Sequence, residues 1–206
     1  HMKEYTTKQR TLLLSVFQEH GGQPLSIDGI LAQLPPGSQI SRSAVYRNVD
    51  KLAQEGLRFT QCYSGTTVSA PSRSSLITGL HTGHTPIRGN KEIAPEGQFA
   101  LPEGTQTMFS IFKQAGYTTG AFGKWGLGSP GSEGDPNKQG IDNFYGYNCQ
   151  LLAHNYYADH LWENDKRIDL PGNQNGDFGS YTQDMIQEKA LEFIDKNKNE
   201  NFFLFL

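Results

Sequence analysis

The stretch VSAPSRSSLITG, residues Val68 to Gly79, places a hydroxyl, a proline and an arginine between Ser69 and Arg73. A bend at the proline, followed by a helix, would hold an oxyanion near the helix N-terminus and the guanidinium group. So short a motif is also typical of an ordinary Ser/Pro turn with a solvated arginine. From these residues alone, both an anion site and a plain turn remain open.

The chain around this stretch is rich in Gly, Thr and Tyr, and turn signals such as SPGSEGDP and PGNQNGD separate short apolar segments. The pattern predicts a helix over 106–114, a strand over 118–122, an amphipathic helix within 185–197 and a buried strand at 201–206. Helices that alternate with strands predict an α/β sheet. An unpaired edge of that sheet would favour self-association.

Three strings in this part of the chain carry a more specific signal. FTQCYSGTTVSAPSRSSLITGLHTGHTPIRGN (59–90) resembles the first signature of the type I sulfatases, C/S-x-P-x-R-x-x-x-x-T-G. GYTTGAFGKWGLG (116–128) resembles the second signature, and QGIDNFYGYNCQLLAHNYYADHLWEND (139–165) resembles the segment that follows it in carbohydrate-type bacterial members. The resemblance implies an alkaline-phosphatase-like α/β fold and hydrolysis of sulfate esters, with a sulfated carbohydrate as the substrate.

The resemblance also implies roles for three residues. Ser69 stands where a sulfatase-maturing enzyme oxidises the side chain to formylglycine, whose hydrate attacks sulfur and whose second hydroxyl then expels sulfate. Arg73 matches the arginine that steadies the hydrate, and Lys124 matches the lysine that binds the nucleophile and the sulfate. An unmodified serine with no adjacent histidine is a poor nucleophile. Whether Ser69 is natural or replaces a cysteine stays open.

Two features depart from the family pattern. The commoner second signature, G-K-W-H-L-G, has a histidine that contacts the nucleophile, where this chain has Gly126. His154 is our candidate for a substrate contact and His160 is the second, with a structural role as the alternative for each. The family also implies calcium, which needs several hard oxygen ligands. Asp28 and Asp50 lie in helical contexts, so no metal ligand is assigned.

Residues 1–57 follow a helical pattern instead. Apolar spacing and capping signals predict one helix from about Thr7 to His20, a second from Ser26 to Leu34 and a third after Ser41. The third helix has an apolar stripe and an opposite polar and basic face, whose residues include Arg42, Ser43, Tyr46 and Arg47.

Three compact helices with this face are typical of a helix-turn-helix DNA-binding motif, although a merely solvated helical face has the same pattern. The strings 5–35 and ISRSAVYRNVDKLAQEGL (40–57) resemble the N-terminal winged-helix domain of the ferric uptake regulator family. By that resemblance Tyr46 would contact bases, and Arg42, Ser43 and Arg47 would lie near bases or phosphates. The wing and the dimerisation domain of that family are not recognisable, which predicts weak DNA affinity.

The composition fits a folded chain of 206 residues. Hydrophobic residues make up 35%, charged residues 19% and the formal net charge is -3, values that do not indicate disorder. No apolar run approaches the ~20 residues of a transmembrane helix. Cys62 and Cys149 lie far apart and are expected to be buried thiols. Localisation stays open.

The two patterns predict two domains: a truncated winged-helix segment over 1–57 and a partial sulfatase α/β domain over 58–206. The leading hypothesis is a sulfatase that depends on formylglycine and calcium and acts on sulfated carbohydrate. The first alternative is a DNA-binding transcription regulator. The second is a chimera whose parts fold but carry neither activity.

Overall fold

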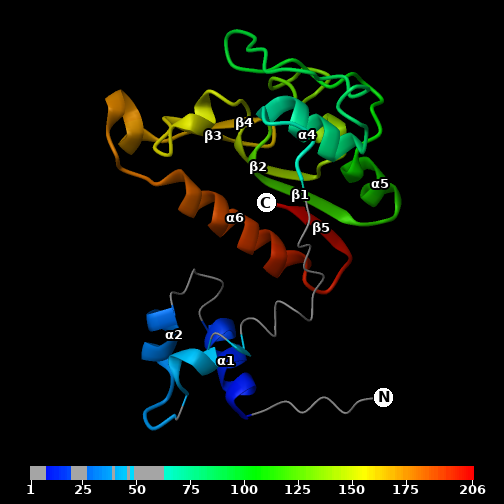
Figure 1. Cartoon of the computed structure of the whole chain (residues 1–206). Helices are drawn as coiled ribbons and strands as arrows, with labels where there is room; N and C mark the ends of the chain where they lie inside the picture. The colour runs from blue at the N-terminus through cyan, green and yellow to red at the C-terminus, as the bar shows by residue number, and fades with distance from the viewer. Residues whose placement is uncertain (1–7, 20–26, 39, 46, 49–62) are drawn as a thin grey trace. The chain divides into compact units, whose positions relative to one another are not determined.

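The computed structural model describes residues 8–19, 27–38, 40–45, 47–48 and 63–206 (Figure 1). The chain divides into two compact units, residues 1–62 and 63–206. Among the described residues, no helix combines the length and the apolar character that crossing a bilayer requires. Each unit has a hydrophobic core of its own.

The first unit is helical where it is described. It contains α1 (Lys8–Glu19), α2 (Ile27–Gln33) and a further helical segment at 42–45 and 47–48. The start of that segment is capped by Ser41, whose Oγ accepts a hydrogen bond from the N–H of Ala44 at 3.2 Å. The core of the unit is apolar and combines all three helical segments: Leu13, Val16, Ile30 and Val45 are buried.

The second unit is built on a five-stranded sheet with the order β4-β3-β2-β1-β5. The strands are β1 (Thr118–Lys124), β2 (Asn143–Tyr147), β3 (His160–Glu163), β4 (Lys166–Asp169) and β5 (Phe202–Phe205). β1 runs parallel to both β2 and β5, whereas β3 and β4 form an antiparallel hairpin beside β2. The α/β sheet predicted from the sequence is therefore confirmed.

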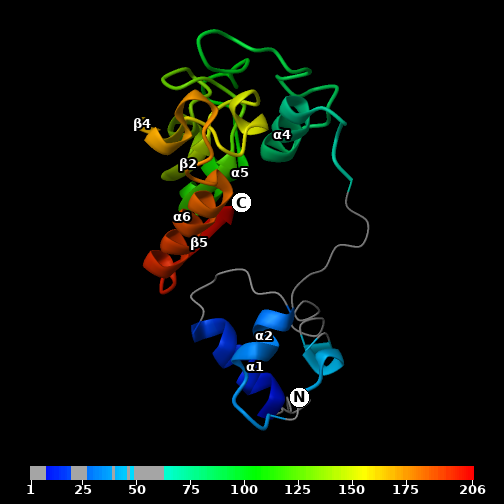
Figure 2. The same cartoon turned by 90° about the vertical axis from the view of Figure 1, so that its left-hand side faces the viewer.

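Helices cover both faces of this sheet (Figures 1 and 2). α4 (Ser69–Thr78) and α5 (Met108–Gln114) lie on one face, and α6 (Thr182–Asn197) lies on the other. Short 3-10 helices, η1 (Pro136–Gln139), η2 (Leu152–His154) and η3 (Pro171–Gly176), connect these elements. The unit thus has three layers around two apolar cores.

The alternation of side chains along the strands explains the two cores. Ala121 packs toward α4 and α5, and its neighbour Phe122 packs toward α6. The same alternation separates Phe144 from Tyr145 on the adjacent strand. Successive side chains of a strand point to opposite faces, so both faces must be apolar when helices cover both.

Two details differ from the sequence expectations. The helix at the Ser69 motif begins at Ser69 itself, whereas the sequence suggested a bend first and a helix after it. Pro71 lies in the first turn, where a helix tolerates proline because no intrahelical N–H bond is lost there. The strand at 202–205 was expected to be buried but is half-buried, because β5 is the edge strand of the described sheet. Self-association through that edge stays a prediction.

Candidate functional site

α4 sets the position of Ser69 and Arg73. The helix starts at Ser69, and the N–H of Ala70 donates to Oδ1 of Asn90, a residue of the following loop, at 2.9 Å. Asn90 therefore caps the first turn in place of Val68, whose side chain makes no cap hydrogen bond. Residues four apart lie on the same side of a helix, so Ser69 and Arg73 share one side of α4.

Arg73 links α4 to the carboxyl end of β1. Its Nη1 donates to the carbonyl oxygen of Lys124 at 2.6 Å, although the two residues lie far apart in the sequence. Lys124 is the last residue of β1, the strand at the centre of the parallel part of the sheet. In open α/β sheets, ligands bind outside the carboxyl ends of parallel strands. The sequence signatures named both residues, and the structure brings them together.

The electrostatics of this pair suit an anion. Burial lowers the pKa of the Arg73 guanidinium. Burial also lowers the pKa of Lys124, and the positive charge of Arg73 lowers it further. Within the described part of the chain, neither cation forms a salt bridge with a carboxylate. Two partly buried cations with no carboxylate partner among the described residues have the chemistry to bind an anion.

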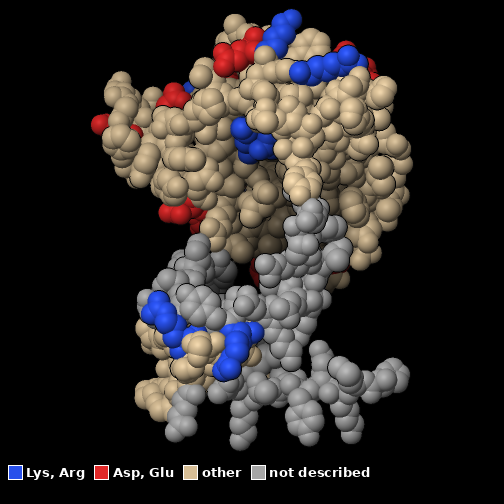
Figure 3. Space-filling model, in the orientation of Figure 1, with Lys and Arg blue, Asp and Glu red and all other residues tan. Residues whose placement is uncertain are grey.

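Charge is local on the exposed surface of the second unit. On the face drawn in Figure 3, Lys and Arg atoms and Asp and Glu atoms lie in small separate groups within a neutral surface. No broad field of one sign covers the drawn and described part of this face.

Gln150 occupies the space of a side chain at position 126. Gly126 has a φ of 74°, and a Cβ built there would lie 2.2 Å from Nε2 of Gln150. The same Nε2 donates to the carbonyl oxygen of Gly126 at 3.1 Å, and Oε1 of Gln150 is buried with no partner among the described residues. A histidine at position 126 would displace Gln150. No motif of the sequence points to Gln150, since only the fold brings it to this position.

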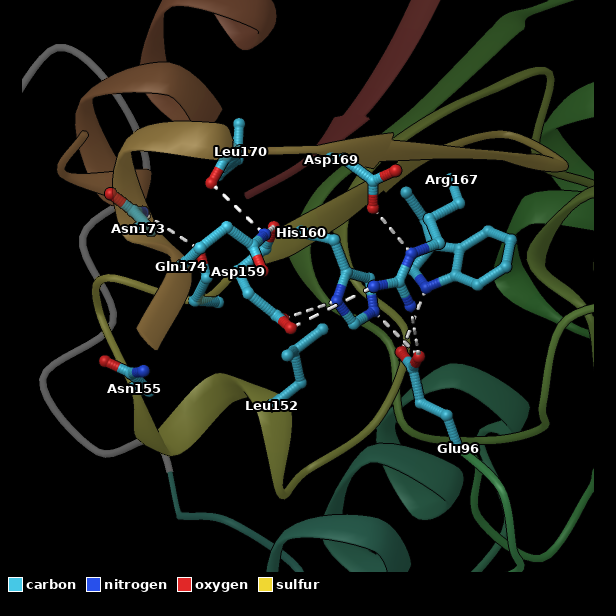
Figure 4. A network of polar contacts seen from close by, with 12 residues as sticks. Glu96, Leu152, Asn155, Asp159, His160, Arg167, Asp169, Leu170, Asn173 and Gln174 are labelled. Carbon is cyan, nitrogen blue, oxygen red and sulfur yellow. Dashed lines mark hydrogen bonds and ion pairs between the residues drawn. The ribbon is translucent and has the colours of Figure 1, made fainter. Parts of the chain in front are cut away.

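The two candidate histidines have different surroundings. His154 is the last residue of η2 and is exposed. His160 opens β3 and is only 5% exposed. Its Nε2 lies 2.7 Å from Oε2 of Glu96, and its Nδ1 lies 2.6 Å from Oδ1 of Asp159 (Figure 4). The substrate contacts predicted for both histidines stay predictions.

The contacts of His160 favour its charged form. Burial by itself would lower the pKa of His160, but the hydrogen bonds to Glu96 and Asp159 outweigh it and raise the pKa. For Glu96, burial likewise opposes ionisation, and the hydrogen bonds from His160 and Trp162 hold its pKa below the ordinary value. Carboxylates accept hydrogen bonds only, so both ring nitrogens of His160 act as donors. Neither nitrogen is then left for a substrate unless one contact breaks.

The calcium that the family resemblance implies does not fit the described residues. They contain no group of three or more His, Cys, Asp or Glu side chains that could hold a metal ion. Asp28 lies in α2, but its side chain lies outside what the structure describes, as does Asp50. No step of the chemistry is therefore assigned to a metal in this chain.

The predicted DNA-binding residues are partly described. Arg42, Ser43 and Arg47 are exposed, and Ala44 and Val45 of the same segment are buried. Tyr46 lies outside the described residues. Cys149 is buried as expected, and burial raises the pKa of its thiol, whereas Cys62 lies outside the described part. The exposed face of the third helical segment agrees with the predicted pattern but does not test a DNA contact.

Comparison with known proteins gives one consistent family. The chain is 29% identical over 198 residues to N-acetylglucosamine-6-O-sulfatase of Bacteroides thetaiotaomicron, covering 95% of this chain and 29% of that protein. It is 33% identical over 177 residues to an arylsulfatase of Hemicentrotus pulcherrimus, covering 77% of this chain and 31% of that protein. The chain thus spans less than a third of the length of these relatives.

Solved structures agree with this assignment. The crystal structure of Ps i-CgsB in complex with k-i-k-neocarrahexaose matches with a TM-score of 0.61 and 26% identity, over 78% of this chain and 38% of that one. The structure of BT4656 in complex with its substrate D-glucosamine-2-N,6-O-disulfate matches with a TM-score of 0.54 and 29% identity, over 77% and 28%.

The family model begins before the predicted domain boundary. The model described as Sulfatase matches residues 37–206, so the match starts inside the first unit, upstream of the boundary predicted at 57 and 58. The relatives described above carry no information on a winged helix, and the assignment of residues 1–57 to the ferric uptake regulator family stays a prediction. From residue 37 onward, the chain belongs to the sulfatase family.

Proposed function

We propose that the second unit carries the nucleophile region of a sulfuric ester hydrolase that acts on sulfated carbohydrates. The observation that carries the proposal is the contact between Arg73 and Lys124 at the carboxyl end of β1, one helical turn from Ser69. Membership of the sulfatase family supports the reaction class. The relatives named for sulfated amino sugars support the substrate class.

In this proposal Ser69 is the residue that becomes the nucleophile. Its hydroxyl makes no hydrogen bond to a base among the described side chains, so the unmodified alcohol is not activated. Conversion to formylglycine by a sulfatase-maturing enzyme supplies an aldehyde hydrate, which is a better nucleophile than an alcohol. Ser69 is half-buried at the first position of α4, where the backbone N–H groups of the first turn add positive potential.

Arg73 and Lys124 hold and polarise the sulfate group. The positive charges of the two side chains would stabilise the negative charge that develops on the sulfate oxygens in the transition state. The hydrogen bond of Arg73 to the Lys124 carbonyl fixes the guanidinium group relative to β1, so the ligand does not have to order it. The proposal includes the activity of the whole enzyme, which is hydrolysis of sulfate esters, and its substrate class, which is sulfated carbohydrate.

Sulfate binding tests the proposed site directly. Titration of the chain with inorganic sulfate, followed by calorimetry or NMR, is expected to give binding that Lys124→Gln and Arg73→Gln each weaken by about tenfold. Lys113→Gln is the matched control, because Lys113 is an exposed lysine that pairs with Asp142 on α5's side of the sheet. Equal sulfate affinity in the wild type and in Lys124→Gln would contradict the proposed site.

DNA binding by the first unit remains a separate hypothesis. It rests on the exposed Arg42, Ser43 and Arg47 and on the resemblance of the sequence. It predicts salt-sensitive binding to a palindromic site, weakened by Arg47→Ala. Unchanged binding in that variant would count against the recognition-helix assignment.

A further inference from the structure

A large open cavity lies beside the hairpin of β3 and β4. Its volume is about 1120 Å³, and its lining comes from the loop 92–97, from the segment 149–160 after β2 and from η3. Small-molecule pockets typically measure about 300–1,000 Å³, so this cavity has room for more than one sugar ring. Neither Ser69 nor Arg73 nor Lys124 contributes to the lining.

The cavity is linked to the segment that follows Arg73's partner Lys124 through contacts of residues 148–151. Cys149 and Leu151 line it, and Gln150 between them contacts Gly126, two residues after Lys124. The N–H of Gly126 also donates to the carbonyl oxygen of Asn148 at 2.8 Å. The segment that follows Lys124 thus contacts the segment that lines the cavity.

The polar lining is held by a fixed network (Figure 4). Glu96 accepts hydrogen bonds from Nε1 of Trp162 at 2.9 Å and from Nε2 of His160 at 2.7 Å. Asp159 contacts His160 at 2.6 Å and lies 4.0 Å from Nη2 of Arg167, which is also 3.9 Å from Glu96. Ordered acceptors of this kind bind hydroxyl groups without further loss of side-chain entropy.

The lining also has an apolar part. Ile93 and Leu151, both in the lining, are 41% and 62% exposed, which is high for large aliphatic side chains. A pyranose ring presents hydroxyl groups at its edge and C–H groups on its faces. Carboxylate oxygens next to exposed aliphatic side chains match both surfaces of such a ring.

The charge of the lining selects among sugars. His160 lies between Glu96 and Asp159, and Arg167 pairs with Asp169 at 2.8 Å and lies 3.9 Å and 4.0 Å from Glu96 and Asp159. These two cations serve three carboxylates, so the network is negative even without Glu92. The third acid of the lining, Glu92, is exposed and forms no ion pair with the described residues. An anionic group of the ligand would meet this uncompensated carboxylate, and like charges at short range repel each other.

We propose that the cavity is a sugar-binding subsite for an uncharged pyranose, and that Glu92 disfavours a uronate there. The proposal rests on the proposed function, because that function places a sulfated sugar next to the cavity. It names the chemical class of the sugar that adjoins the sulfated one.

Two unsulfated disaccharides test the subsite without involving the sulfate site. The probes are N,N'-diacetylchitobiose, which is neutral, and a disaccharide of glucuronate and N-acetylglucosamine. Calorimetric titration of the unmodified chain is expected to give at least about tenfold tighter binding of the neutral probe. The fluorescence of Trp162 gives a second readout, because Trp162 lines the cavity and the other tryptophan, Trp125, is buried.

Variants separate the charge effect from the apolar contact. Glu92→Gln is expected to reduce the preference for the neutral probe to about threefold or less, and Leu151→Ser to weaken binding of that probe. Glu188→Gln removes an exposed carboxylate of α6 that does not line the cavity, and it should leave the preference unchanged.

Equal affinity for the two probes, or no binding of the neutral probe, would overturn the subsite. These results leave sulfate binding at Lys124 untouched, so failure of the subsite is distinguishable from failure of the proposed function. Conversely, the neutral disaccharide could bind as expected while Lys124→Gln leaves the affinity for inorganic sulfate unchanged. That result would overturn only the proposed function.

Discussion

Lys124 carries its charge in a half-buried position next to a second cation, and this decides how anion binding depends on pH. Burial and the neighbouring Arg73 lower the pKa of Lys124, so its charge is lost at a lower pH than that of an ordinary lysine. We expect sulfate affinity to fall as the pH rises toward that lowered pKa. Calorimetric titrations over a series of alkaline pH values measure this.

A conservative variant isolates the cause of this pH dependence. Lys124→Arg keeps a positive charge at every pH of the series, because a guanidinium stays protonated. Its sulfate affinity should therefore stay constant over the range in which that of the wild type falls. A parallel fall in both proteins would assign the pH dependence to another group.

His160 makes a pH-dependent contribution to stability. Its pKa in the folded protein is raised, so the contribution is fully present below the pKa of the unfolded chain and is lost as the pH rises through the folded value. His160→Gln is expected to lower the free energy of unfolding by about 2 kcal/mol near pH 6, and by less at alkaline pH. Urea denaturation at both pH values measures the difference, and an equal loss at both would contradict the charged state of His160.

Individual site residues could be predicted from the sequence only where a motif names them. Ser69, Arg73 and Lys124 follow from the two signatures, but their mutual position follows from the packing of α4 against β1. Glu96 belongs to no motif and contacts His160 across 64 positions of sequence. Its role depends on a tertiary contact, and the spacing of residues in the chain carries no signal for it.

At the scale of the element, α4 depends on a cap that comes from another segment. Asn90→Ala removes the acceptor for the N–H of Ala70 and should cost about 1 kcal/mol of stability. Hydrogen exchange at the Ala70 amide should accelerate accordingly, since its hydrogen bond is lost. Asn90→Asp is the control because it keeps an oxygen acceptor. Unchanged exchange in Asn90→Ala would show that water replaces the cap without cost.

Periodic elements were predictable and the hairpin was not. The helix over 182–197 has an apolar period that matches its burial, so its existence followed from the sequence. The strand over 118–124 has no such alternation, since residues 119–122 are all buried, and its prediction rested on its place after a helix. β3 and β4 are only four residues each, too short for a periodic signal. The local signal was Asn164, which has a positive φ of 54°, a conformation that Asn adopts more readily than most residues other than Gly.

At the scale of the whole molecule, the two units have separate cores and should unfold in separate transitions. Leu13 is fully buried in the first unit and Phe109 is fully buried in the second. Leu13→Ala should lower one calorimetric transition, and Phe109→Ala the other, with a cost of about 3 kcal/mol or more for each. A single transition that both variants shift equally would contradict the division into two units.

The boundary between the two parts was predictable only approximately. Residues 1–57 have a helical apolar pattern and the residues after 58 are rich in turn signals, which suggested a division there. The structure divides the chain between residues 62 and 63. The structural boundary thus lies after the predicted one, whereas the sulfatase match begins before both, at residue 37. A change in the sequence pattern reflects local secondary-structure propensity, whereas a compact unit is defined by tertiary contacts. The boundary predicted from the pattern and the boundary between the units therefore need not coincide.

The central claim, that Ser69 lies in a sulfatase nucleophile site, is tested most directly by the mass of the peptide that contains it. The chain would be co-expressed with a serine-type sulfatase-maturing enzyme, and the Ser69 peptide compared with that from a culture without the enzyme. The account predicts a loss of two hydrogens at Ser69, the signature of oxidation to formylglycine. An unmodified Ser69 under conditions in which the same enzyme matures a known serine-type sulfatase would contradict it.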